Sequence, residues 1–548
     1  MEQYQGSARP NATQAVTEPV TEPSADPSTD SATSSVTAAE AATLSSTMFR
    51  AYDIRGLVET ELTPSSIHLI GRAIGSLALE HGHSEVLFGA DSRLSSPTLA
   101  AALQAGILAS GCNILDLGII PTPLLYFATH TTHCNSGVML TASHNPAEYN
   151  GIKIVRNRSC LTPEQIQAIR ERALQLMASP DAGSKPGPDT VSNAGSEPAP
   201  DTGPKAGSAQ EPGAAPQPAR RAGTLKQHNI LTAYLERVAQ DVRLARPLKV
   251  VVDCGNAVPG LVAPGLFKRL GCDVIPLYCE PDGHFPNHHP DPTVAGNLTT
   301  LIDEVIRHRA DLGIALDGDG DRVVMVTDQG NIIDTDRLLM LLVRDIVPRY
   351  KRPNVVFDVK CSKLLADEII AHGGQPVMSR SGHSFMKFTM QETQAVVGGE
   401  FSAHIFIKDR WFGYDDGLYT AARFLEILAA GHQTAEAMLR SLPTSMVTPE
   451  LRIDVDDDQK FILMEKIASA ASFPKARINR LDGIRADFRD GWGLIRASNT
   501  TPALLLRFEA HSTQSLLQIQ EAFRQLLKQV DKRLDFALPA PLSRTGTA

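Results

Sequence analysis

The sequence predicts an α/β protein with three similar α/β domains, whose sheets are mixed and mainly parallel, and a smaller C-terminal α+β domain. Short β-branched runs that end in an acidic residue recur at 85–91, 249–253 and 354–358, and each passes through a polar turn into a helical pattern. Strands that alternate with amphipathic helices indicate buried, largely parallel sheets. After about residue 441 the pattern changes to alternating strands followed by one long helix, which indicates a domain of another type.

Two segments of biased composition interrupt the foldable chain. Residues 1–47 are rich in Ser, Thr, Ala, Pro and Glu, and residues 179–222 hold nine prolines and a twelve-residue Ala-Gly-Ser repeat without an apolar face. Neither segment can bury enough apolar surface to offset the entropy lost when a backbone is ordered. We therefore predict a disordered tail and a disordered insert that loops into solvent.

The domain boundaries follow from these interruptions. We predict three α/β domains and one α+β domain, at residues 48–178, 223–330, 331–442 and 443–540. In the last domain, apolar residues at helical spacing predict a helix that packs on a sheet. They are Leu516, Ile519, Phe523, Leu526 and Val530.

Length and composition limit the class of protein. With 548 residues, of which 42% are hydrophobic and 21% charged, the chain has globular composition and the length of several domains. It contains no apolar run of the roughly 18 residues that a membrane helix needs, and its start lacks a secretory signal pattern, so we expect no membrane association. The seven cysteines form no CxxC pair, which argues against a disulfide framework or a zinc ribbon and favours a cytoplasmic protein.

The charge is unevenly distributed. The formal net charge is −9, and residues 1–47 contribute six acids against one base. The rest of the chain is nearly balanced and lacks the basic surface that binding of nucleic acid requires. An anionic ligand must therefore be held by local basic groups.

The first candidate site is the turn Thr141-Ala-Ser-His-Asn-Pro146, which follows an apolar strand predicted at 137–140. Pro146 disfavours helix at Asn145, so the segment is an exposed turn at the carboxyl end of a strand, where ligands gather in α/β sheets. Ser143 beside His144 is a possible nucleophile there. A serine that only stabilises the turn is the more common case.

The second candidate site is Asp317-Gly-Asp-Gly-Asp-Arg322, after a strand predicted at 311–316. Three carboxylates separated by glycines let one loop surround a hard cation with oxygen ligands. An EF-hand is excluded, because Arg322 stands where that loop needs glycine and Asp328 where it needs glutamate. A solvated acidic turn would leave this cluster beside an apolar strand unexplained, so the pattern favours metal binding.

The third candidate site is Gly399-Glu-Phe-Ser-Ala-His404, after the apolar run 395–397. Glu400, Ser402 and His404 alternate, so in an extended segment their side chains share one face. A carboxylate, a hydroxyl and an imidazole on one face suit a polyol such as a sugar, although a half-buried strand without a ligand can show the same pattern.

The fourth candidate site is Arg496-Ala-Ser-Asn-Thr-Thr501, between two apolar strands of the last domain. An arginine fork, hydroxyls, an amide and the N–H groups of a turn can form a phosphate cradle. An ordinary β-turn rich in Ser and Asn is an equally good interpretation of this motif alone.

Taken together, the four motifs resemble those of the α-D-phosphohexomutase family, and within it the bacterial phosphomannomutase/phosphoglucomutase type. The likeness begins at Phe49-Arg-Ala-Tyr-Asp-Ile-Arg-Gly56, includes Lys408-Asp-Arg-Trp-Phe-Gly-Tyr-Asp-Asp-Gly417, and keeps all motifs in family order. It covers nearly everything outside the tail and the insert, which have no counterpart in it.

The resemblance implies four domains around a central cleft and an isomerase that interconverts the 1- and 6-phosphates of mannose and of glucose. Ser143 would be a phosphoserine that donates its phosphoryl group to the free hydroxyl of the substrate. The resulting hexose 1,6-bisphosphate, which is both intermediate and activator, would turn around and return its other phosphate to Ser143. The cofactor would be Mg²⁺, held by Asp317, Asp319 and Asp321 together with Ser143.

The resemblance also implies roles for the other site residues. Arg55, His144 and Lys153 would lie near the reacting hydroxyl, and one of them would handle its proton. Glu400 and Ser402 would hold sugar hydroxyls. The remaining ligand contacts would come from Tyr52, Arg322, Lys360, His383 and His404, and the phosphate cradle from Arg496, Ser498, Asn499 and Thr500. The expected partners are hexose phosphates only, and the expected state is a monomer.

Three alternatives remain at this point. A phosphoglucosamine mutase would share the family, but the residues around Glu400 resemble the mannose/glucose class more closely, although Ala403 replaces a usual glycine. A Mg²⁺-dependent sugar-phosphate phosphohydrolase would leave the loops at 141–146 and 496–501 without a role. A non-catalytic binding protein is the third alternative, but every position that the family uses for chemistry is filled in this sequence, which such a protein would not need. The segment Asn287–Asp291 looks like a metal cluster, but we interpret it as loop structure.

Overall fold

The computed structural model describes residues 44–178, 221–456, 458–498, 501–539 and 542–543. Most of the predicted tail and insert, and the site residues Asn499 and Thr500, lie outside the described residues. The described chain begins at Leu44, four residues before the predicted boundary. The side chains of Leu44 and Met48 are buried in the apolar core of the first domain, so the tail prediction was wrong for residues 44–47.

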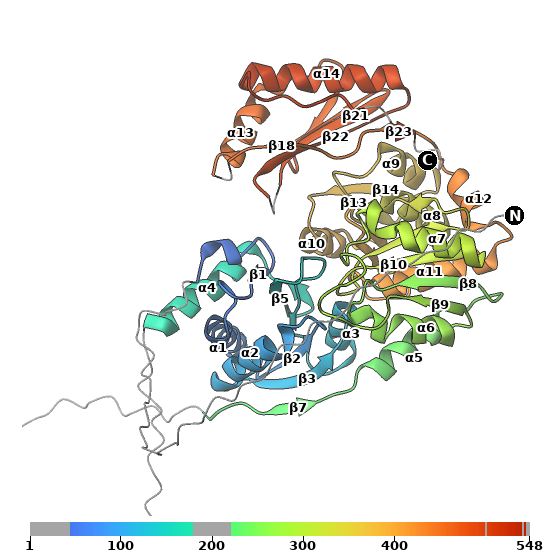
Figure 1. Ribbon diagram of the computed structural model, residues 1–548. Coiled ribbons are helices and arrows are strands. Elements are labelled where there is room, and N and C mark those ends of the chain that lie inside the picture. Colours follow the sequence, from blue (N-terminus) through green and yellow to red (C-terminus); the bar gives the residue numbers. More distant parts are fainter. Residues whose placement is uncertain (1–43, 179–220, 457, 499–500, 540–541, 544–548) are drawn as a thin grey trace, which may run out of the picture. The chain divides into compact units, whose positions relative to one another are not determined.

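The first domain is a mixed sheet with the strand order β1-β5-β4-β2-β3-β7, to which β6 adds by pairing with β5 (Figure 1). Its strands are β1 (Ile54–Leu57), β2 (Glu85–Ala90), β3 (Asn113–Ile119), β4 (Gly137–Leu140), β5 (Tyr149–Arg156), β6 (Ser159–Cys160) and β7 (Leu225–Gln227). Its helices are α1 (Pro64–Glu80), α2 (Ser96–Ala109), α3 (Thr122–Thr131) and α4 (Pro163–Ala178). Strand β2 runs parallel to β3 and β4, whereas β5 is antiparallel to β4.

The position of β7 corrects the predicted boundary at residue 223. Strand β7 pairs in parallel with β3, so the chain first completes the first sheet and only then enters the second domain. The three exposed residues of β7 carry no apolar alternation that a sequence pattern could detect.

The second domain has the strand order β12-β11-β10-β8-β9. Its strands are β8 (Lys249–Asp253), β9 (Asp273–Leu277), β10 (Leu312–Leu316), β11 (Val323–Thr327) and β12 (Ile332–Ile333), and its helices are α5 (Leu231–Asp241), α6 (Ala263–Arg269) and α7 (Thr299–His308). Alternate residues of β8 enter different apolar clusters. Val251 packs in a cluster with Leu301 and Val305 of α7, whereas Val250 and Val252 belong to the main core. Both faces of this sheet are therefore covered, as its β-branched strands predict.

The third domain has the strand order β14-β13-β15-β16. Its strands are β13 (Asn354–Asp358), β14 (Gln375–Ser379), β15 (Val397–Gly399) and β16 (Ile405–Ile407), and its helices are α8 (Thr335–Ile346), α9 (Lys363–Ala371), α10 (His383–Thr393), α11 (Gly417–Ala430) and α12 (Ala435–Arg440). Helix α11 begins where the Asp416 side chain accepts a hydrogen bond from the Tyr419 N–H at 2.8 Å, which is ordinary N-capping. Four short 3₁₀ helices of the described chain lie at Ser46–Met48, Val258–Leu261, Ala295–Leu298 and Val347–Arg349.

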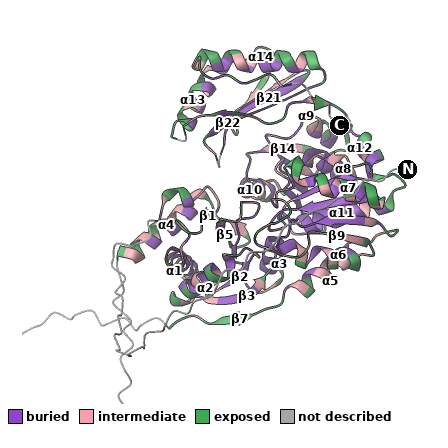
Figure 2. Cartoon of the chain, viewed as in Figure 1, coloured by how far each residue is buried: buried purple, intermediate pink, exposed green. Residues whose placement is uncertain are grey.

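The fourth domain is an antiparallel sheet with the order β19-β20-β21-β22-β17-β23, and β18 also pairs with β22. Its strands are β17 (Met446–Val447), β18 (Leu451–Asp454), β19 (Arg477–Asn479), β20 (Ile484–Phe488), β21 (Gly491–Ala497), β22 (Ala503–Ala510) and β23 (Leu542–Ser543), and its helices are α13 (Lys460–Ala470) and α14 (Thr513–Val530). The stripe predicted on α14 is buried from Leu516 to Leu526, and the opposite face of this helix is exposed in Figure 2. The predicted architecture of three α/β domains and an α+β domain is confirmed.

The acids that end the three recurrent strands position loops at the carboxyl ends of strands in their sheets. The buried Asp91 accepts a hydrogen bond from the Arg93 N–H at 3.1 Å, and the buried Asp253 accepts one from the Gly255 N–H at 2.9 Å. Asp358 accepts hydrogen bonds from the Phe401 N–H at 3.2 Å and from Ser381 Oγ at 2.9 Å. Asp91 and Asp253 thus fix the turns at the carboxyl ends of their own strands, whereas Asp358 fixes the turns that follow the neighbouring strands β14 and β15. No helix within the described residues is long and apolar enough to cross a membrane.

Candidate active site

The site lies in a cavity of about 520 Å³ that receives side chains from all four domains. Its walls include residues of each predicted loop, whereas the three aspartates of the acidic loop are fully buried and are not among the lining residues. The predicted residues that line it are Tyr52, Arg55, Ser143, His144, Lys153, Arg322, Lys360, His383, Glu400, Ser402, His404, Arg496 and Ser498. Tertiary structure thus brings together side chains that are up to about 450 positions apart in the chain.

Ser143 lies on a strained turn directly after β4. Its φ angle is +52°, which a non-glycine residue rarely adopts and which costs about 1–2 kcal/mol. The Ser143 N–H donates to Thr141 Oγ1 at 2.9 Å. Ser143 Oγ lies 2.6 Å from Asp317 Oδ2 and 3.2 Å from His144 Nδ1. The hydroxyl is therefore presented to the acidic loop of the second domain.

A buried arginine holds this turn, and the sequence motifs did not indicate it. The guanidinium of Arg93 donates to the carbonyl oxygens of Ser143 (2.8 Å), Asn145 (2.6 Å), Pro146 (2.6 Å) and Tyr149 (3.1 Å). Its Nε lies 3.2 Å from Asp91 Oδ2. Five N–H donors on one planar group allow it to satisfy so many acceptors. In the sequence, the only indication of this role is that Ser92 and Arg93 follow Asp91 at the end of a predicted strand. Many surface turns have the same pattern.

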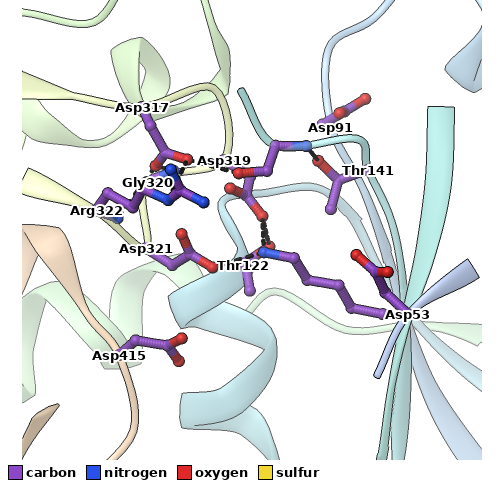
Figure 3. A network of polar contacts seen from close by, with 12 residues as sticks. Asp53, Asp91, Thr122, Thr141, Asp317, Asp319, Gly320, Asp321, Arg322 and Asp415 are labelled. Carbon is purple, nitrogen blue, oxygen red and sulfur yellow. Dashed lines mark hydrogen bonds and ion pairs between the residues drawn. The ribbon is translucent and has the colours of Figure 1, made fainter. Parts of the chain in front are cut away.

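The acidic loop joins the antiparallel strands β10 and β11. Asp317, Asp319 and Asp321 are fully buried, and one oxygen from each lies within 4.8 Å of the others. Asp317 Oδ1 accepts hydrogen bonds from the N–H groups of Gly320 and Arg322 at 3.0 and 3.1 Å, as Figure 3 shows. A Cβ on Gly318 would lie 2.1 Å from the carbonyl oxygen of Ser143, so glycine is required for the loop to approach the serine.

The loop offers a hard cation buried carboxylate oxygens. Among the described residues, Oδ1 of Asp319 and Oδ1 of Asp321 are buried and have no hydrogen-bond partner. Burial and the neighbouring carboxylates raise the pKa of Asp317 well above its usual value. Buried carboxylates that repel one another are stabilised when a cation binds between them. The residues present therefore fit Mg²⁺.

Lys153 reaches the same cluster from β5. Its Nζ donates to Asp319 at 2.6 Å and to Asp321 at 2.5 Å. Burial lowers the pKa of Lys153, but these carboxylates outweigh that effect and raise the pKa above its usual value. Arg55 lies nearby and donates to Asn145 Oδ1 at 2.6 Å and to Asp53 Oδ2 at 2.7 Å. Burial, Arg322 and Arg55 lower the pKa of His144 well below its usual value.

The segment from Glu400 to His404 is a turn, so the prediction of an extended segment was wrong. Gly399 of β15 pairs with Ile405 of β16 in an antiparallel hairpin, and the residues between them must reverse the chain. Ala403 has a φ angle of +75°, which explains why glycine is usual at this position in the family that the sequence resembles.

The turn still gathers the three predicted side chains. His404 Nδ1 lies 3.3 Å from Glu400 Oε2 and 3.3 Å from Ser402 Oγ, and His404 Nε2 lies 3.3 Å from Asp321 Oδ1. Burial lowers the pKa of His404, but Asp321 and Glu400 raise it to about 9. Burial raises the pKa of Glu400, whereas His404 and Lys360 bring it below the usual value. An imidazolium thus links the sugar turn to the acidic loop.

Other predicted ligand contacts surround this turn. The ring of Tyr52 meets the ring of His383 edge-on at 4.7 Å, and burial raises the pKa of Tyr52 to about 12. Lys360 Nζ lies 3.4 Å from Asp358 and 3.8 Å from Glu400. Tyr52, His383 and Lys360 thus give the cavity hydroxyl, imidazole and ammonium groups.

The phosphate cradle is partly described. Arg496 is the penultimate residue of β21, and Ser498 follows that strand; both are buried. Ser498 Oγ accepts hydrogen bonds from the N–H and the hydroxyl of Thr501 at 3.1 and 2.8 Å. Thr501 also lines the cavity, although it was not among the site residues predicted from the sequence.

The segment Asn287–Asp291 forms structural contacts. His288 Nε2 lies 2.9 Å from Asp253 Oδ2, and Asn287 donates to Asn256 Oδ1 at 2.7 Å. The Pro290 carbonyl accepts a hydrogen bond from the Gly318 N–H at 3.1 Å. The interpretation as loop structure agrees with these contacts, but His289 also lines the cavity, which the sequence did not indicate.

Comparison with known proteins agrees with this architecture. Profiles of the phosphoglucomutase/phosphomannomutase family match the chain as alpha/beta/alpha domains I, II and III and as the C-terminal domain, at residues 46–178, 232–330, 334–446 and 450–526. The phosphomannomutase/phosphoglucomutase of Pseudomonas aeruginosa is 46% identical over 499 residues, which are 91% of this chain and 98% of that protein.

The chain belongs to the phosphoglucomutase/phosphomannomutase family.

Two further relatives extend the comparison. The phosphoglucomutase of Neisseria gonorrhoeae is 41% identical over 89% of this chain and 98% of its own. The crystal structure of a phosphoglucomutase/phosphomannomutase family protein from Burkholderia thailandensis superposes with a TM-score of 0.79 and 37% identity, covering 90% of this chain and 99% of that one. The family resemblance drawn from the four motifs is therefore confirmed over nearly the full length of these mutases.

Proposed function

We propose that this member of the phosphoglucomutase/phosphomannomutase family interconverts the 1- and 6-phosphates of mannose and glucose, and that Ser143 carries the transferring phosphoryl group. The family assignment supports mutase activity of this type. The observation that carries the role of Ser143 is its position. Its hydroxyl lies on a strained turn at the cavity wall, 2.6 Å from Asp317 and 3.2 Å from His144.

In the proposed first step, the free hydroxyl of a hexose monophosphate attacks the phosphorus of phosphoserine 143. The bond between phosphorus and Ser143 Oγ breaks, and a bond to the sugar oxygen forms. Phosphoryl transfer depends mainly on positioning and charge neutralisation. Mg²⁺ bound by Asp317, Asp319, Asp321 and a phosphoserine oxygen would supply part of that neutralisation, and Arg322 would contact the same phosphoryl group.

The hydroxyl must lose a proton during this attack. The guanidinium of Arg55 stays protonated in proteins, and Lys153 Nζ already donates to two carboxylates. His144 has a ring nitrogen 3.2 Å from the serine oxygen. We therefore propose His144 as the proton acceptor, with Arg55 and Lys153 stabilising negative charge.

The bisphosphate must then bind in two orientations. We propose that Glu400 and Ser402 hold sugar hydroxyls that are similar in both orientations. Tyr52, Lys360, His383 and His404 complete the walls around the sugar. The phosphate that does not react would be held by Arg496, Ser498, Asn499 and Thr500, of which the last two lie outside the described residues.

The domain limits are also part of the proposal. We retain the predicted ranges, except that residues 44–47 and 223–227 are assigned to the first domain, because Leu44 belongs to its core, Gly223 and Thr224 hydrogen-bond to it, and β7 belongs to its sheet. Cytoplasmic location, a monomeric state and the disorder of the remaining tail and insert stay predictions from the sequence.

The test compares isomerised product with free phosphate for mannose, glucose and glucosamine phosphates, with and without Mg²⁺. We expect 1-/6-phosphate exchange on mannose and glucose, dependence on Mg²⁺, and little free phosphate. Predominant phosphate release would instead indicate a phosphohydrolase, and a preference for glucosamine phosphate would indicate the amino-sugar mutase.

The role of Ser143 is tested by mass spectrometry and by substitution. Peptide mapping should place one phosphoryl group, about 80 Da, on Ser143, and Ser143→Ala should lose most of its activity. Ser469→Ala, which alters an exposed serine on α13, is the matched control and should retain activity. Full activity in Ser143→Ala would exclude the mechanism.

A further inference from the structure

The phosphate-binding arginine of the proposed mechanism is held by a single carboxylate. Nε of Arg496 lies 3.1 Å from Oδ2 of Asp482, and the two side chains are 6% and 14% exposed. Among the described residues, Nη2 of Arg496 is buried and has no hydrogen-bond partner. Asp482 therefore pairs with Nε and leaves Nη2 without a partner, on a side chain that lines the cavity.

The turn that carries Asp482 is packed closely against Arg496. It joins β19 and β20, and Gly483 follows Asp482 with a φ angle of +78°. A Cβ on Gly483 would lie 2.2 Å from the Ile495 carbonyl oxygen and 2.7 Å from Arg496 Cβ. Only glycine allows both this conformation and this approach. The backbone around Asp482 is thus built to sit beside β21 at the arginine.

The same carboxylate oxygen also binds the third domain. Asp482 Oδ2 accepts a hydrogen bond from the Ser381 N–H at 3.0 Å. The next residue, Gly382, donates its N–H to Glu400 Oε1 at 2.9 Å. Ser381 Oγ donates to Asp358 Oδ2 at 2.9 Å. One oxygen therefore connects the arginine of the fourth domain to the turn that orients Glu400 and begins helix α10.

We propose that Asp482 is a positioning residue that aims Arg496 at the non-reacting phosphate and couples this contact to the turn holding Glu400. This inference rests on the proposed function of Arg496. The geometry explains how one site holds both ends of the substrate: the phosphate contact and the sugar contact share a hydrogen-bonded anchor. Asp482 is not among the residues that line the cavity, so its effect is transmitted through Arg496 and Ser381.

The first test is Asp482→Asn in the full-length chain, with steady-state kinetics from glucose 1-phosphate and from mannose 1-phosphate. Asparagine keeps the size of the side chain but removes the charge that holds the guanidinium, and one of its ends becomes a donor. We expect KM to rise about tenfold, as for the loss of one charge-assisted hydrogen bond, and more bisphosphate to be released. Phosphorylation of Ser143 should be unchanged.

A double-mutant cycle separates positioning from simple stabilisation. If Asp482 acts through Arg496, Asp482→Asn should have little further effect on KM in an Arg496→Ala background, because interacting residues are not additive. Additive effects, or a lowered melting temperature with unchanged KM, would overturn the inference. Asp482→Glu keeps the charge but displaces the oxygen, so its KM should lie between those of the parent and Asp482→Asn. It also provides a second test of the inference if the asparagine variant folds poorly.

The control is Asp487→Asn on β20. Asp487 pairs with Arg485 Nε at 3.1 Å, so the substitution removes a similar ion pair of the same domain without touching the cavity. It should leave both kcat and KM unchanged. If Arg496→Ala alone had no effect, the proposed phosphate role of Arg496 would fail. If Arg496→Ala were impaired but Asp482→Asn were not, only the positioning role would fail.

Discussion

Replacing Gly318 by alanine should separate the acidic loop from Ser143. The added Cβ would lie 2.1 Å from the Ser143 carbonyl oxygen, and an ordinary contact begins at 3.4 Å. The two backbones must therefore separate by about 1.3 Å, and misplacement of about 1 Å in an active site costs on the order of 10²-fold in rate. Pro290 Cγ lies 3.4 Å from the same Cβ position, so the added methyl group also contacts the segment that holds the loop.

The variant is measured by the mutase assay across a Mg²⁺ titration, together with a thermal melt. We expect kcat/KM to fall about 100-fold and the Mg²⁺ concentration for half-maximal activity to rise, because the Ser143 hydroxyl would move away from Asp317, with which it would hold the proposed Mg²⁺. Gly265→Ala is the matched control. Gly265 lies in α6 with nothing within 4 Å of its Cβ position, so alanine should leave activity intact and stabilise the helix by up to about 1 kcal/mol.

A Gly318→Ala variant within threefold of the parent at the same Mg²⁺ concentration would refute this reasoning. It would show that close approach of the acidic loop to Ser143 is not required for phosphoryl transfer. A variant that loses activity only because it unfolds would be recognised by its melting temperature.

Three further predictions concern the scaffold of the site. Arg93→Lys should lower stability by about 3 kcal/mol and reduce Ser143 phosphorylation, because one ammonium cannot satisfy the four carbonyl oxygens that Arg93 holds; denaturant titration and intact mass test this, and full phosphorylation would contradict it. Gly483→Ala should raise KM for both hexose phosphates and destabilise the chain by about 2 kcal/mol, through its left-handed φ and its contact with Ile495; an unchanged KM would count against the packing argument. Burial raises the pKa of Asp416 to about 7, so its carboxyl group favours the folded state at low pH and this advantage is lost as pH rises from about 4 to 7. The stability of Asp416→Asn relative to the parent should therefore be higher at pH 8 than at pH 5. Thermal melts that give the same difference in stability between the two proteins at both pH values would exclude the effect.

Some features of this protein follow from local sequence alone. The recurrent strands at 85–90, 249–253 and 354–358 are present as predicted, because β-branched runs bounded by polar turns have few other stable conformations. The apolar stripe of α14 is likewise set by a spacing that only a helix places on one face. The acidic loop needed only its own glycines and aspartates to indicate a cation site.

Other features depend on contacts between distant segments, which no local pattern encodes. The exposed strand β7 is defined by its pairing with β3, and the turn at Glu400–His404 by the pairing of β15 with β16. Arg93 and Asp482 look like ordinary surface residues in the sequence, and only burial and hydrogen bonding to segments about 50 or 100 residues away show that they hold site loops. Sequence therefore indicated most of the chemical groups that line the site. Tertiary structure added Thr501 and His289 and decided which backbone holds each group, because that choice depends on packing and on satisfying buried polar atoms.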